Sequence, residues 1–318
     1  QTATDQIFSV PMAGSTGYSS FVTNAGEMTT TAHEAVLYLT PVKSPNFQWD
    51  MNVNFTKIIN KVAELAEGIE SVSLAGYVTP NVRAYAGYTY PTIYGVQMAR
   101  DDDGNILIDD DPTSYYYGMP MAGESGKIGD VSPDFILGLV NSFKYKFVTL
   151  SAQVDWKQGG DIYSGSNRLM ALYGSAGFTE DRTTPFQYKD TENAKGVGVK
   201  ASTGEVNDIV RGGPDDIWAY PDFYADLFGN IDEMAVYETS YIKLREVSLS
   251  VTLPKSLISP LKLKGASVSL IGRNFLLWST LPNVDPETSQ GMGNGVGGFE
   301  YMSLPQTTSY GVSLNLTF

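Results

Sequence analysis

Side chains able to carry out covalent chemistry are scarce in this chain. The sequence contains one histidine, His33, and no cysteine, which excludes disulfides, thiolate metal sites and thiol nucleophiles. A serine hydrolase would need His33 as its base, but His33 stands beside Glu34 among threonines and no G-x-S-x-G sequence accompanies it. We interpret His33 as a polar residue at a strand rim. We expect no catalytic residue, no cofactor and no metal centre, since one histidine cannot form a multi-histidine site.

The acidic residues occur in short runs that look like loop tips. The run Asp101-Asp102-Asp103-Gly104-Asn105 fails the register of an EF-hand calcium loop, which needs a later glycine and a terminal glutamate. The apolar residues that follow it predict a β-hairpin turn at Asp103-Gly104 inside a surface loop, and adventitious calcium is left open. The net charge of −14 argues against nucleic-acid binding, because lysine and arginine are too few to neutralise a phosphate backbone.

Aromatic residues concentrate in two regions that read as long loops. Aromatic faces near carboxylates and amides bind sugars or apolar peptide side chains, and they also anchor loops to one another. The sequence favours packing and leaves contact with a ligand or a covering partner as the alternative. The aromatic candidates are Tyr115, Tyr116, Tyr117, Trp218 and Tyr220.

The remaining polar candidates alternate with apolar residues along short segments. Successive side chains of a strand point to opposite faces, so each segment would have one apolar and one polar face. In a transmembrane β-barrel the apolar face meets lipid and the polar face meets the lumen. Trp49, Tyr145, Trp156, Trp278 and Tyr310 recur near segment ends, as an interfacial girdle requires. The candidates for transient ligand contacts in the lumen are Gln48, Asp50, Asn52, Gln153, Asp155, Lys157, Glu246 and Arg273.

The segments that must position these residues are strands joined by connections of alternating length. The strands are predicted at 47–55, 135–145, 147–157, 246–253, 266–279 and 309–318. Short turns at 41–46, 145–146 and 254–263 alternate with long connections at 58–132, 159–238 and 280–304. Short periplasmic turns and long extracellular loops are the rule for outer-membrane barrels. Residues 55–68 have helix-like apolar spacing, and we assign them to a loop.

Composition agrees with a β-protein. Gly 32, Tyr 20 and Phe 14 accompany a charged fraction of 18%, below the roughly 25% usual for soluble domains. No apolar run approaches the ~20 residues of a membrane-spanning helix, whereas barrel strands need only about ten. The segment that begins at Gln1 lacks a signal peptide, so we expect that it was removed or that the chain is an internal fragment.

Several motifs resemble the SusC/RagA-type TonB-dependent transporters of Bacteroidetes outer membranes. Ser240 to Pro254 is similar to the family's SYxRLxxxxLxYxLP signature, Gly272 to Trp278 to its GxNLxxx(W/F), and Asp285-Pro286-Glu287 to its DPE. Further matches are Asn24 to Met28, Ile128 to Asp130 and Gln158 to Tyr163. Thr30 and Ala32 stand where the family usually has asparagine and glycine, ahead of the matching Glu34.

The resemblance implies an all-β fold in which residues 1–318 are the C-terminal part of a TonB-dependent receptor β-barrel. About eight antiparallel strands would belong to a plugged barrel of about 22, with the plug and earlier strands absent from this chain. The implied function is nutrient import across the cell outer membrane, for glycans or oligopeptides. The implied partners are the N-terminal portion, a SusD-like surface lipoprotein, the TonB complex and membrane lipid. Phe318 would be the barrel-assembly signal.

Two alternatives remain at this stage. An outer-membrane barrel enzyme would need a constellation around His33. A soluble β-sandwich binding module would place the apolar strand faces in a closed core.

Overall fold

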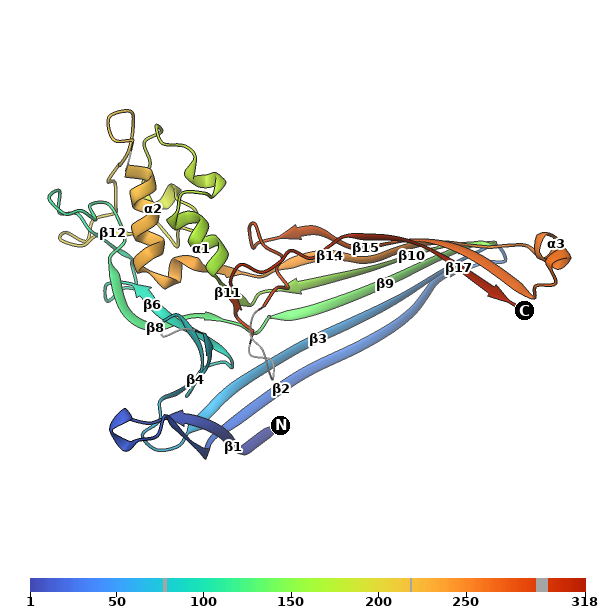
Figure 1. The fold of residues 1–318 in the computed structure, drawn as a ribbon, viewed down its shortest axis with the longest axis horizontal. Coiled ribbons are helices and arrows are strands. Elements are labelled where there is room, and N and C mark those ends of the chain that lie inside the picture. Colours follow the sequence, from blue (N-terminus) through green and yellow to red (C-terminus); the bar gives the residue numbers. More distant parts are fainter. Residues whose placement is uncertain (77–78, 218, 290–296) are drawn as a thin grey trace.

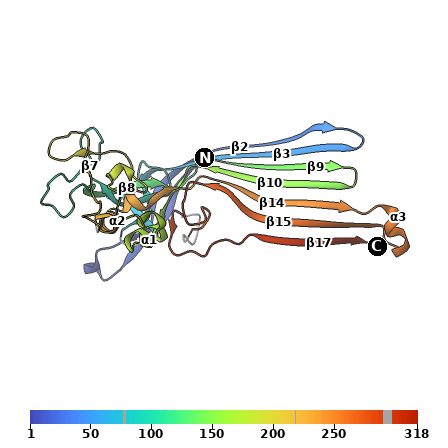
Figure 2. The same ribbon diagram turned by 90° about the horizontal axis from the view of Figure 1, so that it is seen from above.

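The main element of the computed structural model is one antiparallel sheet of eight long strands (Figures 1 and 2). The structure describes residues 1–318 except 77–78, 218 and 290–296. The strands follow the order β1-β2-β3-β9-β10-β14-β15-β17. Their bounds are β1 Thr2–Pro11, β2 Ser20–Lys43, β3 Phe47–Leu65, β9 Phe135–Tyr145, β10 Val148–Gln158, β14 Tyr241–Thr252, β15 Gly265–Ser279 and β17 Ser309–Thr317. The prediction of about eight antiparallel strands is confirmed.

The connections are sorted by length between the two ends of the sheet, except that the short connection between β1 and β2 at 12–19 lies at the same end as the long ones (Figure 1). Figure 1 shows the turns at 44–46 and 146–147 and the short helix α3 (Lys255–Ile258, followed by η5, Ser259–Leu261) at one end. The long connections between β3 and β9, β10 and β14, and β15 and β17 gather at the other end (Figure 2). This arrangement confirms the predicted alternation of short turns and long loops.

The long connections form a packed layer of their own. It contains the four-stranded sheet β4-β5-β6-β8, the three-stranded sheet β13-β11-β16, the pair β12-β7 and the helices α1 and α2. Their bounds are β4 Ser71–Gly76, β5 Asn81–Tyr85, β6 Thr92–Met98, β7 Leu107–Ile108, β8 Ala122–Asp130, β11 Asp161–Ser164, α1 Gly165–Leu172, β12 Val199–Lys200, α2 Ala219–Asn230, β13 Val236–Glu238 and β16 Phe299–Glu300. Short 3-10 turns complete it: η2 Gly177–Thr179, η3 Tyr188–Asp190 and η4 Asp232–Ala235. A further 3-10 turn, η1 Gly14–Thr16, lies in the connection between β1 and β2.

The core of this loop layer surrounds α2. Phe223, Tyr224 and Phe228 of α2 are almost fully buried and pack in one apolar cluster with Ile93 of β6 and Ile108 of β7. Burial of aromatic side chains of this size is the main stabilising term available to such a small layer. Within the described ranges, no helix is long and apolar enough to span a membrane.

The assignment of residues 58–65 to a loop is wrong, because they continue strand β3. A register shift between Glu27 and Met28 of β2 leaves Ala63 of β3 as an extra residue. Such a β-bulge interrupts the two-residue alternation. Val62 and Leu65 therefore both contribute to one apolar cluster beneath β4 and β5. The bulge explains the spacing that resembled a helix.

One face of the eight-stranded sheet is covered by apolar side chains in continuous rows. Residues directly opposite one another form a row across six neighbouring strands: Trp49, Phe143, Leu150, Leu249, Leu270 and Val312. Leu270 is 55% exposed and Val312 is 73% exposed. None of these six residues belongs to a buried apolar cluster found among the described residues. A β-sandwich would bury this face, so the soluble-sandwich alternative is wrong.

Candidate ligand-facing surface and loop pocket

The opposite face of the sheet carries the eight polar residues that the alternation predicted for the lumen. Asn52, Gln153, Glu246 and Arg273 lie in one row, which is continued through Val140 of β9. The neighbouring rows hold Gln48, Asp50, Asp155 and Lys157. The structure thus brings the predicted set onto a single surface, while a role in ligand contact stays a prediction.

Most polar groups on this face already pair with one another. Gln48 Nε2 donates to Asp50 Oδ2 at 2.7 Å, and Thr40 Oγ1 donates to Asp50 Oδ1 at 2.8 Å. Arg273 Nε lies 2.7 Å from Glu246 Oε2. Asn52 Oδ1 is buried and accepts no hydrogen bond from any described residue. A surface of mutually satisfied polar groups suits weak, exchangeable contacts better than tight binding of one ligand.

The loop end of this face holds a buried charge cluster that the sequence pattern did not predict. The side chain of Lys243 is fully buried, and its Nζ lies 2.8 Å from both carboxylate oxygens of Asp285 and 2.7 Å from Glu287 Oε2. Arg245 Nε contacts Asp155 Oδ2 at 2.6 Å, and Arg245 also forms two hydrogen bonds to Glu287. We call these five residues, Lys243, Arg245, Asp155, Asp285 and Glu287, the wall–loop cluster.

A bulge in β14 creates the geometry of the wall–loop cluster. Gln153 pairs with Glu246 and Val154 with Leu244, so Arg245 is the extra residue and reaches the polar face together with Lys243. Burial acts to raise the pKa of Glu287, but hydrogen bonds from Arg245, Lys243 and Tyr241 outweigh it and lower the pKa to about 2. The cluster fastens the segment around Asp285 to the sheet, so Asp155 is engaged in a structural ion pair.

Charge complementarity was a sequence signal for this contact. The two basic residues Lys243 and Arg245 have the same two-residue spacing as the acidic residues Asp285 and Glu287. The ammonium group of Lys157, another predicted lumen residue, is already hydrogen-bonded, because its Nζ donates to Thr239 Oγ1 at 2.6 Å.

Of the aromatic candidates in the loops, two tyrosines pack against the loop-layer core and two are exposed to solvent. Tyr117 and Tyr220 pack against the loop-layer core, and the Tyr220 ring meets Phe186 edge-on with centroids 4.6 Å apart. Tyr115 is 63% exposed and Tyr116 is 46% exposed. Trp218 lies outside the described residues.

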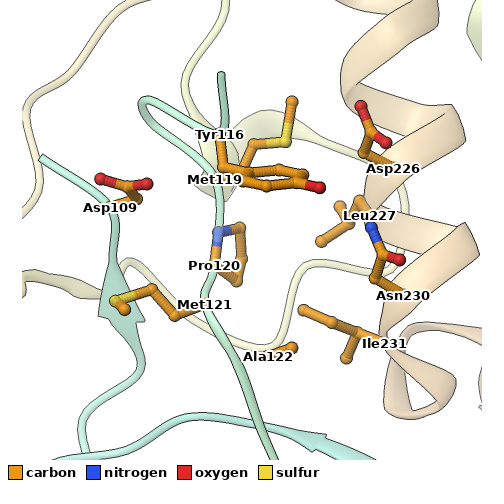
Figure 3. A pocket seen from close by; sticks show the side chains of 10 residues that line it. All are labelled: Asp109, Tyr116, Met119, Pro120, Met121, Ala122, Asp226, Leu227, Asn230 and Ile231. Atoms are coloured by element: carbon orange, nitrogen blue, oxygen red, sulfur yellow. The ribbon is translucent and has the colours of Figure 1, made fainter. Parts of the chain in front are cut away.

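Tyr116 lines a pocket in the loop layer, shown in Figure 3. The pocket has a volume of about 360 Å³ and lies between α2 and the segment 109–122. Its lining includes two carboxylates, those of Asp109 and Asp226, but no lysine or arginine. Apolar side chains form most of the remaining wall: Met119, Pro120, Met121, Ala122, Leu227 and Ile231.

The residues considered for catalysis or metal binding, His33 and the acidic run 101–105, lie outside this pocket and outside the wall–loop cluster. His33 is exposed on β2 and pairs in register with Lys57. Gly104 N donates to the carbonyl of Asp101 at 3.0 Å in a hairpin closed by Arg100 and Ile106. The predicted hairpin is present, but the central residues of this turn are Asp102 and Asp103, one position before the predicted Asp103-Gly104. Over the described part of the chain, no group of three or more histidine, aspartate or glutamate side chains is arranged to hold a metal ion.

The chain is similar over its whole length to proteins of known class, although no protein-family model matches it. TonB-dependent receptor P26 of Formosa agariphila is 26% identical over 340 residues, covering 99% of this chain and 31% of the relative. TonB-dependent receptor P3 of the same organism is 23% identical, with 99% and 31% covered. The chain therefore spans about a third of the length of these relatives.

Solved structures show the same fold. The RagAB peptide transporter matches with a TM-score of 0.66 at 18% identity, covering 100% of this chain and 32% of that chain. The "closed-closed" state of the RagAB peptide importer matches with a TM-score of 0.62. The resemblance to SusC/RagA-type TonB-dependent receptors, the partial-barrel fold and the outer-membrane location inferred from the sequence are confirmed.

Proposed function

We propose that this chain, a segment with the sequence character and fold of SusC/RagA-type TonB-dependent receptors, is the C-terminal part of an outer-membrane importer of oligopeptides or glycans. An N-terminal portion of the same transporter supplies the plug and the remaining strands. The chain contributes barrel wall and extracellular loops. The observation that carries the proposal is the two-faced sheet, whose apolar rows cross six strands while polar rows occupy the other side.

The proposed partners follow from the orientation of the sheet in the membrane. With the short turns on the periplasmic side, the loop layer, built mainly from residues 66–134 and 159–240, faces outward, where it meets the ligand and a SusD-like surface lipoprotein. The RagAB peptide transporter supports this assignment by likeness of fold. Energy reaches the barrel through the TonB complex, which acts on the absent N-terminal portion.

The proposed import requires no covalent chemistry from this chain. The alternative of a barrel enzyme has only His33 as a candidate base, and His33 stands on the exposed face of β2 beside Lys57. Substrate would instead pass along exchangeable polar groups such as those of Gln153 and Glu246.

Uptake by the native host tests this proposal. Deletion of the gene for the intact transporter should abolish accumulation of at least one labelled oligopeptide or oligosaccharide pool, and the intact gene should restore it. Restoration should fail when TonB is absent. Unchanged uptake of both pools, or uptake that does not depend on TonB, would contradict an importer.

A further inference from the structure

The four-stranded sheet of the first long loop has an open edge that side chains of the second long loop cover. β5 pairs with β6 only as far as Tyr94, and in the described part of the chain no strand continues along that edge. Val96 and Met98 lie two residues apart on β6, so their amides point to the same edge. Val96 N donates to Asp232 Oδ2 at 2.9 Å, and Met98 N donates to Glu233 Oε2 at 2.9 Å. The two acidic residues of η4 thus take the place of a neighbouring strand.

Glycine is required where the two loops approach each other. A Cβ atom on Gly95 of β6 would lie 2.8 Å from Asp232 Cβ, and a Cβ atom on Gly129 of β8 would lie 2.9 Å from Asp161 Cβ. Asp161 uses this close approach in the same way as Asp232, because its Oδ2 accepts from Asp130 N at 2.8 Å. The second loop is therefore fastened to the sheet of the first loop near both of its ends.

These contacts make separation of the loops a concerted event. Burial raises the pKa of Asp232 and of Asp161, and the hydrogen bonds from the backbone amides act in the opposite direction. Glu233 also pairs with Arg100 of the first loop, whose Nη2 lies 2.5 Å from Oε1. Loss of one contact alone would leave a buried amide or carboxylate without a partner, which disfavours partial separation.

We propose that Asp161, Asp232 and Glu233 form a clasp that makes the two longest loops, 66–134 and 159–240, move as one body. This mechanical property goes beyond the proposed function, because it holds for either substrate class. Any movement at the outer mouth of the barrel would displace both loops together, since the clasp lies between them.

Amide-resolved hydrogen–deuterium exchange on the intact transporter in detergent tests the hydrogen bonds of the clasp. Val96 and Met98 should exchange slowly in the wild-type protein although they lie at a sheet edge. Asp232→Ala should accelerate exchange at Val96 at least tenfold, whereas Asp232→Asn, which keeps a carbonyl acceptor, should change it by about threefold or less. Asp222→Ala is the control, because Asp222 is an exposed carboxylate of α2 in the same loop, and it should have no effect. Rapid exchange at both amides in the wild type would overturn the proposal, even if Asp232→Ala does not fold.

Distances between spin labels in the intact transporter test whether the loops move together. Labels attached to Ser125→Cys on β8 and Tyr173→Cys after α1, both at exposed positions, report on one loop each. The wild-type clasp should give a narrow distance distribution, and joint Asp232→Ala and Glu233→Ala substitution should widen it at least twofold. Gly95→Ala should also widen it, because the new Cβ displaces Asp232 while all three carboxylates remain. A broad distribution with the wild-type clasp, or an equally narrow one in both variants, would overturn the proposal.

Discussion

Among single residues, Lys243 has the most consequential position. Its side chain has no exposed surface, and among the described residues its ammonium group forms ion pairs with Asp285 and Glu287, which come from a segment about 40 residues later. Removing one partner of a buried ion pair leaves uncompensated charge and costs about 3–5 kcal/mol. The strength of the wall–loop cluster therefore depends on all of its members.

We predict that Lys243→Met strongly destabilises the intact protein. The midpoint of denaturant unfolding in detergent should fall by an amount equivalent to about 3 kcal/mol. Lys127→Met is the control, since Lys127 makes one ion pair, to Asp130, with 31% and 39% of the two side chains exposed. Such exposed pairs contribute about 0–1 kcal/mol. Equal effects of the two substitutions would show that the cluster is not a stabilising contact.

Phe318 is the other residue for which we make a prediction. It is 77% exposed at the short-turn end of the sheet, beside the last strand. If the aromatic terminus is the assembly signal, deletion of Phe318 should reduce the amount of heat-modifiable barrel severalfold and leave transport per folded molecule unchanged. Normal barrel levels with lowered transport per molecule would assign Phe318 to transport instead.

At the level of elements, parity along strands was the productive sequence signal. The segment predicted at 147–157 alternates without a break from Val148 onward, and β10 has bounds within one residue of it. Residues 58–65 were assigned wrongly because a bulge at Ala63 shifts the two-residue alternation of apolar and polar side chains. The bulge depends on pairing with β2, so the local sequence does not reveal it. The loop-layer core joins Ile93, Ile108 and Phe223, residues whose contact depends on tertiary packing of remote segments.

The pairing register gives a prediction about the two faces of the sheet. Leu150 and Leu249 are directly opposite on the apolar face, and Thr149 and Ser250 are opposite on the polar face. In the intact protein in lipid, single cysteines at Leu150 and Leu249 should react with a lipid-soluble maleimide. Cysteines at Thr149 and Ser250 should be protected from it. Reaction of all four positions, or the inverse pattern, would reverse the assignment of the faces.

For the whole molecule, the two edges of the sheet are decisive. β17 pairs with β15 on one side, and β1 pairs with β2, with irregular register between Ala3 and Ile7. In the described residues the sheet order ends at β1 and β17, which leaves one side of each strand without a partner in this chain. All nine residues of β17 are exposed. In lipid, each unpaired backbone group costs several kcal/mol, because no water is present to replace the missing hydrogen bond.

We therefore predict that residues 1–318, exported alone, do not form a stable barrel. The fragment should give no heat-modifiable band in outer-membrane fractions and should be degraded by protease. Co-export of the N-terminal portion should restore both the band and protease resistance, since its strands would pair with β1 and β17 and close the sheet. The intact transporter serves as the control. A heat-modifiable, protease-resistant band from residues 1–318 alone would mean that β17 and β1 close on each other, and it would contradict the assignment of this chain as one part of a larger barrel.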